Sequence, residues 1–182
     1  MGKLKEVTVD ELSSAGIEIS DLVAAGAKIE DIEAALDIGD IGIDFDRVAV
    51  LDEDPWALGA TDRGTAIDNA LGNNVGHNYP VIDKFDEATG NVTSIKSYDT
   101  AAQTYQTTDG FANKITADID KLADFKGRTW GETDISLKDI TSKTLEIVIP
   151  PTPLTPAQVA AINSAEVYAA SKDIELIITI VR

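Results

Sequence analysis

Cysteine is absent from this chain of 182 residues, which excludes disulfide bonds, thiolate catalysis and thiolate-bound zinc or iron–sulfur sites. No stretch approaches the roughly 18 uninterrupted apolar residues that a transmembrane helix needs, so stable membrane insertion is not expected. The first residues also lack the apolar core of a secretory signal peptide. Apolar residues nevertheless make up 43% of the chain, which is sufficient for the core of one globular domain with an appended segment.

Basic residues are scarce: 15 Lys and Arg stand against 32 Asp and Glu, giving a formal net charge of -17. More than half of the excess negative charge lies before residue 60. Proteins that bind nucleic acids usually present a positive field to the phosphates. A nucleic acid is therefore expected to bind only to a locally basic face of this chain, with few phosphate contacts and a shallow salt dependence.

Residues 7–36 contain a ten-residue repeat, which is visible when they are written as VTVDELSSAG, IEISDLVAAG and AKIEDIEAAL. Each unit has capping or acidic residues where a short helix would begin, and Gly16 and Gly26 stand where the first two helices would end. This pattern predicts a stack of short helices, and a single bent amphipathic helix is the alternative. We expect an acidic, all-helical segment over residues 1–46, acting as a spacer, a translocation segment or a binding surface, and a linker over residues 47–61.

Residues 62–182 have the pattern of an α/β domain. The segment TDRGTAIDNALGNN, residues 61–74, predicts a helix. Residues 81–85 and 92–98 predict a two-stranded hairpin around the turn DEATGN. Helical spacing then dominates over residues 100–125.

The end of the chain predicts a strand, a crossover helix and a second strand. TPAQ, residues 155–158, is a capping box with Pro at the first helical position, and the helix should end near Ser171. IELIITIV is almost entirely apolar and predicts a central strand, while DISLKDI and TLEIVIP are further strand candidates. The fold class expected is α/β, with a mixed central sheet flanked by helices.

Asp83 and Lys96 lie on the two strands of the predicted hairpin. Side chains alternate between faces along a strand, so Ser94 and Lys96 share a face toward which Asp83 can point. Asp68 lies on the preceding helix and can project toward the edge of the sheet. Hard oxygen ligands select Mg²⁺ or Mn²⁺, and a lysine can stabilise a phosphorane, so this trio suits phosphodiester hydrolysis. An ordinary surface ion pair is the alternative.

Several short motifs occur in order along this region: RGTAIDNALG, YPVID, TSIKS, TYQ, DIDKLADF and LEIVIP. In these motifs the chain, from Arg63 to its C-terminus, resembles the tRNase domains at the C-terminus of contact-dependent growth inhibition toxins. Those domains belong to the PD-(D/E)XK, restriction-endonuclease-like superfamily, so the resemblance implies that fold. It does not extend to the ten-residue repeats.

The resemblance also implies roles for individual residues. Asp83 would be a metal ligand, Lys96 the catalytic lysine, and Asp68 the additional acidic ligand at a helix position where the family usually has Glu. Ser94 stands where the superfamily has an acid, and its hydroxyl would assist orientation in the catalytic site. Five further side chains are candidates for substrate contact, with local packing or pairing as the alternative for each: Arg63, His77, Gln103, Tyr105 and Arg128.

By the same resemblance, the chain is expected to cleave tRNA in target bacteria with Mg²⁺ or Mn²⁺ as its cofactor. It would be a secreted or delivered effector that acts in the cytoplasm of the target cell. A cognate immunity protein would neutralise it in the producing cell. The alternatives are a DNA endonuclease toxin of the same fold and a non-enzymatic interaction module in which the Asp83–Lys96 pair is structural.

Overall fold

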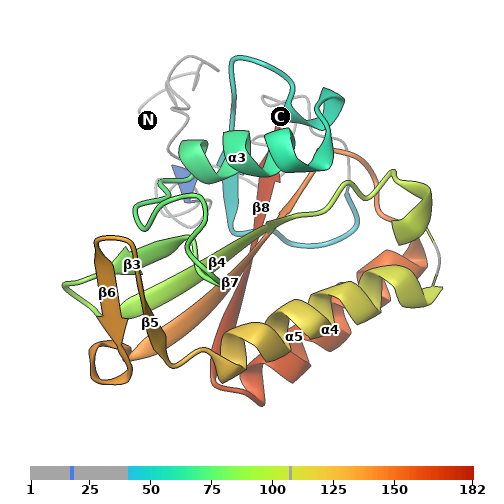
Figure 1. The fold of residues 1–182 in the computed structure, drawn as a ribbon. Coiled ribbons are helices and arrows are strands. Elements are labelled where there is room, and N and C mark those ends of the chain that lie inside the picture. Colours follow the sequence, from blue (N-terminus) through green and yellow to red (C-terminus); the bar gives the residue numbers. More distant parts are fainter. Residues whose placement is uncertain (1–16, 19–40, 107) are drawn as a thin grey trace, which may run out of the picture.

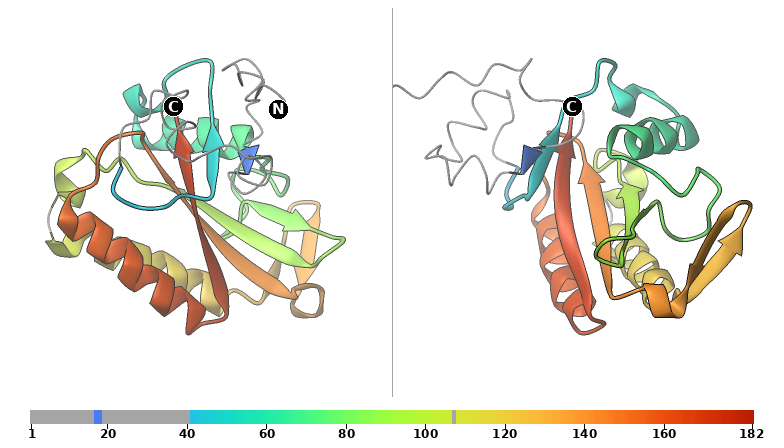
Figure 2. Two further views of the ribbon diagram at one scale, coloured as in Figure 1. Left: turned by 180° about the vertical axis from the view of Figure 1, so that it is seen from behind. Right: turned by 90° about the vertical axis from the view of Figure 1, so that its left-hand side faces the viewer.

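The computed structural model describes residues 17–18, 41–106 and 108–182. A six-stranded mixed sheet runs through this part of the chain in the order β1-β2-β8-β7-β4-β3, and β5 and β6 form a separate two-stranded sheet. Figures 1 and 2 show α4 and α5 on one face of the large sheet and α3 on the other. A mixed central sheet flanked by helices confirms the fold class expected from the sequence.

The central strands of the large sheet are parallel, and its two edge strands are antiparallel to their neighbours. Central parallel strands are covered on both faces, which explains why the sequence of β8 is almost entirely apolar. The strands span Ile17–Glu18 (β1), Arg47–Ala49 (β2), Lys84–Asp86 (β3), Asn91–Ser97 (β4), Gly127–Trp130 (β5), Thr133–Ser136 (β6), Ser142–Ile149 (β7) and Ile174–Val181 (β8).

Three α-helices and three 3-10 turns connect these strands in the part of the chain that is described. None of the described helices is both long and apolar enough to cross a membrane. The helices span Ala60–Ala70 (α3), Thr108–Asp124 (α4) and Pro156–Ala170 (α5), and the 3-10 turns span Pro55–Ala57 (η2), Gln103–Tyr105 (η3) and Leu137–Asp139 (η4).

The segments β7, α5 and β8 form the predicted βαβ unit, with β7 and β8 as parallel neighbours. The predicted capping box is present: Thr155 Oγ1 accepts from Gln158 N at 3.2 Å, and Gln158 Oε1 accepts from Thr155 N at 2.8 Å. The Gln158 side chain also donates to the carbonyls of Thr100 and Tyr105. These bonds fix the segment after β4 to the start of α5.

Two apolar layers position the helices on the sheet. The larger layer lies between the sheet and the helices α4 and α5. On the opposite face, Ile67 of α3 and Leu71, the residue that caps the C-terminus of α3, pack against a group that includes Ile95 of β4. The helix that carries Asp68 is therefore anchored over the strand that carries Lys96.

A side chain from β7 caps the C-terminal end of α4. Lys143 Nζ donates to the carbonyls of Leu122, Ala123 and Phe125 at 2.9, 2.6 and 2.8 Å. The last carbonyls of a helix have no intrahelical donor, and a cation there also complements the helix dipole. Burial lowers the pKa of the Lys143 ammonium below its usual value. The contact joins α4 to the central sheet.

Several segments differ in detail from the sequence prediction. Residues 47–49, which the sequence placed in a linker, form β2 and pair with β8, although the division of the chain into domains stays a prediction. The strand expected over residues 81–85 is shorter and begins at Lys84, because Val81 has a φ of 77° that is incompatible with an extended strand. The helix expected from Thr100 begins only with α4, after the 3-10 turn η3.

The predicted repeat segment lies largely outside the described residues. Of the repeat itself only Ile17 and Glu18 are described, and they form β1, so the segment over residues 1–46 is not all-helical, contrary to expectation. These two residues lie between the predicted end of one short helix at Gly16 and the predicted start of the next, and the alternation of aliphatic and acidic residues in IEI suits an edge strand. The predicted strand DISLKDI divides into β6 and η4, because Ser136 and Asp139 form a capping box that starts the 3-10 turn.

Candidate active site

The structure brings Asp83 and Lys96 together where β3 begins and β4 nears its end, away from the turn that joins the two strands. Lys96 Nζ donates to Asp83 Oδ2 at 3.0 Å and to the carbonyl of Ile95 at 2.7 Å. The backbone N–H of Ile95 donates to the same Asp83 oxygen at 2.7 Å. The side chains of Asp83 and Lys96 are 14% and 31% exposed. The pair is therefore shielded enough for its charges to interact more strongly than on an open surface, yet a ligand can still reach it.

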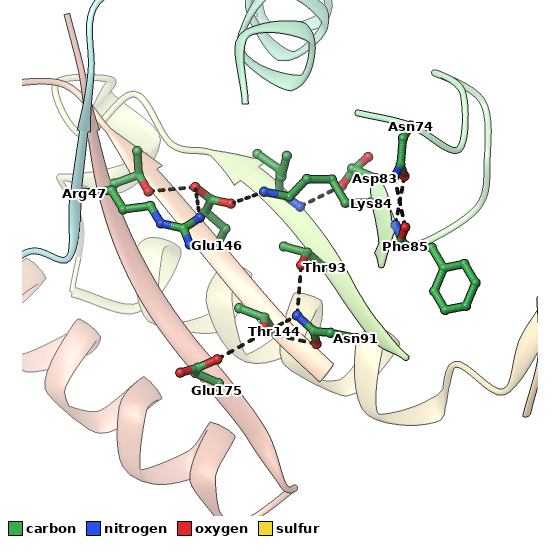
Figure 3. A network of polar contacts seen from close by, with 12 residues as sticks. Arg47, Asn74, Asp83, Lys84, Phe85, Asn91, Thr93, Thr144, Glu146 and Glu175 are labelled. Carbon is green, nitrogen blue, oxygen red and sulfur yellow. Dashed lines mark hydrogen bonds and ion pairs between the residues drawn. The ribbon is translucent and has the colours of Figure 1, made fainter. Parts of the chain in front are cut away.

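The backbone around Asp83 is held from two sides. Asp83 N donates to the Thr93 carbonyl at 2.8 Å, and Asn74 N donates to the Asp83 carbonyl at 3.2 Å. The Asn74 side-chain amide also exchanges two hydrogen bonds of 2.9 Å with the backbone of Phe85, as Figure 3 shows. Asn74 therefore pairs with the open edge of β3 much as another strand would, and fixes the loop that leads to Asp83.

Asp68 reaches this region from α3. Its pKa is raised from 3.8 to about 7, first by burial and then by the negative charge of Asp83. The Lys96 ammonium opposes this rise, and the charge of Glu146 adds to it. Asp68 is thus close enough to the Asp83–Lys96 pair to share its electrostatic field, and the trio expected from the sequence is brought together.

Ser94 shares β4 with Lys96 but is only 1% exposed. Its Oγ donates to the carbonyl of Val81 at 2.6 Å, rather than to Asp83 or Lys96. The hydroxyl is therefore engaged with the backbone two residues before Asp83.

Glu146, which the sequence analysis did not select, forms a second charged group beside the trio. It is fully buried on β7, directly across from Ile95 in the sheet register. Lys84 Nζ lies 3.1 Å and Arg47 Nη1 lies 3.6 Å from its carboxylate, and Thr179 Oγ1 donates to it at 2.8 Å. Figure 3 shows Lys84 and Arg47 reaching Glu146 from two other strands. The sequence signal was a lone acid inside the apolar run LEIVIP.

A polar cavity of about 740 Å³ lies beside these groups. It lies on the same face of the sheet as α3, over the part of that face that α3 does not cover. Lys84, Asn74 and Thr93 line it, but Asp83, Lys96 and Asp68 do not. Four carboxylates also line this cavity, against two cations, so its walls do not favour a phosphate. These carboxylates are Asp46, Asp86, Glu87 and Glu175.

Comparison with known proteins identifies the family. The family described as the CDI toxin restriction endonuclease-like domain matches residues 63–179. This chain belongs to that family. A chain of a solved structure, described as the CdiA-CT/CdiI toxin and immunity complex from Yersinia pseudotuberculosis, is 30% identical with a TM-score of 0.53. The match covers 62% of this chain and 90% of that chain. No curated protein matches this chain.

Asp68 and Asp83 are the acids of this CDI toxin domain that would hold a small divalent cation. Within the described residues no group of three or more His, Cys, Asp and Glu is arranged to hold a metal ion. Mg²⁺, however, is usually held by only one or two carboxylates, with waters and substrate phosphate as its other ligands. Asp68 and Asp83 provide such a pair. The pKa of Asp68 is raised first by burial and then by the charge of Asp83, and a divalent cation between the two carboxylates would offset that second contribution.

Two of the proposed substrate contacts in the toxin domain have other partners. Arg63 is only 9% exposed, lies 3.9 Å from Asp99 and stacks over the Trp56 ring at 5.4 Å from its centroid. Arg128 is exposed on β5 and lies over the ring of Trp130. A role for either in substrate binding stays a prediction.

The other three proposed contacts lie on the segments between helices and strands. His77 is exposed in the loop between α3 and β3, and Gln103 is exposed on η3. Tyr105 is partly buried and packs edge-to-face with Tyr98 and Phe111, which ties it to the core on the α4 side of the sheet. Substrate contacts by these residues also stay predictions.

Proposed function

We propose that this domain is a metal-dependent nuclease toxin that cleaves tRNA in target bacteria. The observation that carries the proposal is the grouping of Asp83, Lys96 and Asp68 in a CDI toxin restriction endonuclease-like domain. Asp83 and Asp68 supply two carboxylates, and Lys96 supplies a cation that remains partly exposed. These are the groups needed to activate water and to offset charge on a phosphate.

In the proposed mechanism, Asp68 and Asp83 would hold Mg²⁺ or Mn²⁺, with the carbonyl of Ile95 as a further oxygen ligand. The bound ion supplies Lewis acidity and lowers the pKa of a coordinated water. Asp68 would give up its proton on metal binding, because burial and the charge of Asp83 keep its pKa high and a bound cation would favour the ionised form. Lys96 orients the attacking water and stabilises the negative charge that develops on the phosphate.

The choice of tRNA rests on the sequence motifs, which resemble those of tRNase toxins. Carboxylates, a lysine and a divalent ion act on the phosphate and on water, which RNA and DNA cleavage share. Duplex DNA is the second candidate, because the matching family is described as restriction endonuclease-like. With a net charge of -17, the chain should bind either substrate through few phosphate contacts.

We also infer a cognate immunity protein and delivery into a target cell, where the domain would act in the cytoplasm. The family description as a CDI toxin supports delivery. The solved relative is described as a complex of toxin and immunity protein, which supports a partner of the same kind for this chain.

The deciding experiment incubates the purified chain with total tRNA and, separately, with supercoiled plasmid, in Mg²⁺, Mn²⁺ or EDTA. Lys96→Ala removes the proposed catalytic cation. Lys172→Ala is the matched control, because Lys172 is an exposed lysine that pairs with Asp120 on the far side of the sheet. We expect metal-dependent loss of tRNA with the wild type and the control, and none with Lys96→Ala.

Cleavage of the plasmid alone, abolished by Lys96→Ala, would replace tRNA with DNA and keep the nuclease. An inhibitory effect on bacterial growth that survives Lys96→Ala, without cleavage of either nucleic acid, would favour the non-enzymatic interaction module instead.

A further inference from the structure

Val81 has a backbone conformation that its residue type rarely adopts. Its φ is 77°, in the left-handed region, where a β-branched side chain is strained. Among the described residues, the other non-glycine with positive φ is Asp173, whose residue type tolerates this region far better. Unusual backbone of this kind often accompanies functional sites, and Val81 precedes Asp83 by two residues.

The consequence of this turn is visible in the ladder between β3 and β4. Lys84 is paired with Thr93 in the ladder, and Asp83 N also donates to the Thr93 carbonyl, so two residues of one strand face Thr93 and the register shifts by one residue at this bulge. In an antiparallel ladder continued from the Asp83–Thr93 bond, the Ile95 N–H would donate to the carbonyl of Val81. It donates instead to the carboxylate of Asp83 at 2.7 Å. The Asp83 side chain thus occupies the place of a backbone carbonyl.

The displaced Val81 carbonyl receives its hydrogen bond from Ser94. The Ser94 hydroxyl donates to it at 2.6 Å and is almost completely buried. Without this donor, the Val81 carbonyl would be left without a hydrogen bond. Rotation of the backbone at Val81 would then be favourable, because it would relieve the strained φ and let the carbonyl accept from the Ile95 N–H. Asp83 would then lose the bond that fixes its carboxylate beside Lys96.

We propose that Ser94 is a positioning residue that acts through Val81: its hydroxyl holds the Val81 carbonyl aside, so that the Asp83 carboxylate bonds Ile95 N–H and stays beside Lys96. Ser94 therefore works without touching the metal ion, the water or the substrate. This deepens the proposed nuclease function and rests on it for its catalytic meaning, but the placement of Asp83 can be tested in the metal-free protein.

The test is a double-mutant cycle of Ser94→Ala and Val81→Gly. Glycine adopts positive φ without strain, so Val81→Gly removes the backbone strain at this position. The unpaired carbonyl is then the one remaining cause for the backbone to rotate toward the Ile95 N–H. If Ser94 acts through Val81, the loss of Mn²⁺ affinity caused by Ser94→Ala should be roughly 5- to 30-fold smaller in the Val81→Gly background. This factor corresponds to the cost of the left-handed backbone conformation for a residue other than glycine. If Ser94 contacts the metal or the water, the loss should be the same in both backgrounds.

Two measurements are made on each protein of the double-mutant cycle. The first is the Ile95 amide signal in the NMR spectrum of the metal-free protein, with its rate of hydrogen exchange, which reports whether Asp83 still accepts that bond. The second is Mn²⁺ affinity by calorimetry. We expect Ser94→Ala to shift the Ile95 signal, accelerate its exchange and weaken Mn²⁺ binding, and Val81→Gly to reduce all three effects.

An unchanged Ile95 amide together with an equal loss of Mn²⁺ affinity in both backgrounds would overturn the proposal. Should Ser94→Ala fail to fold, Ser94→Cys replaces the hydroxyl by a weaker hydrogen-bond donor, and its effects are compared in the wild-type and Val81→Gly backgrounds in the same way. If the wild type bound no divalent ion and cleaved no nucleic acid, the proposed function would fail, while the Ile95 signal would still decide whether Ser94 holds Asp83 in place.

Discussion

Replacing Asp68 by Asn should stabilise the metal-free domain at high pH while it abolishes the proposed activity. The pKa of Asp68 is raised from 3.8 to about 7 by burial and by neighbouring negative charge. Its ionised form is therefore less favourable in the folded protein than in the unfolded chain. Between pH 3.8 and about 7 the unfolded chain releases this proton first, so stability falls as the pH rises, and the loss is complete above pH 7.

A shift of this size on a fully buried group would correspond to about 4 kcal/mol. Asp68 is only partly buried, and solvent screening reduces the expected cost to roughly 1–2 kcal/mol. Asn is neutral at every pH, so Asp68→Asn should raise the unfolding temperature at pH 8 by roughly 2–8 °C. At pH 5 the gain should be roughly a third as large, because only part of the titration window has been crossed.

The assay is thermal unfolding followed by circular dichroism in EDTA at both pH values. Asp62→Asn, which changes an exposed acid in the first turn of the same helix, is the control and should give a smaller shift. Equal shifts for Asp68→Asn at pH 5 and pH 8, or a lower unfolding temperature at pH 8, would refute the electrostatic argument. Mg²⁺ should then raise the unfolding temperature of the wild type but not that of Asp68→Asn.

Two further substitutions test the scaffold around the site. Glu146→Gln leaves the cations of Lys84 and Arg47 without their buried counter-charge and should lower the free energy of unfolding in urea by roughly 3 kcal/mol. The exposed Glu175→Gln on β8 should cost less than about 0.5 kcal/mol, and equal losses would contradict a central role for Glu146. Lys143→Met deprives three carbonyls at the end of α4 of their donor and should cost about 2–3 kcal/mol, with faster amide exchange in the last turn. Unchanged exchange there would show that the cap is dispensable.

The sequence predicted those parts of the fold in which local pattern and tertiary structure agree. The Thr155 capping box and the apolar run of β8 predicted the βαβ unit, because helix capping and a buried strand leave direct marks on composition. By contrast, β2 was placed in a linker. Its three residues are too few to form a pattern, and they are a strand only because β8 offers a free edge.

In the candidate site, too, the sequence predicted some features and missed those that depend on tertiary structure. Asp83, Lys96 and Asp68 were selected from spacing and from the family resemblance, and the structure places them together. The turn at Val81 could not be predicted, because nothing in a valine signals a positive φ. Glu146 was visible as an acid inside an apolar strand, but its partners come from strands far apart in the sequence.

The account depends most on a divalent ion held by Asp83, which Mn²⁺ binding measures directly. Electron paramagnetic resonance of free Mn²⁺ should show one ion bound per chain for the wild type and for Asp86→Asn, an exposed acid three residues away. Asp83→Asn keeps an acceptor for the Ile95 N–H but removes the charge, and it should abolish the binding. Equal binding by all three proteins, or none by the wild type, would contradict the proposed metal site.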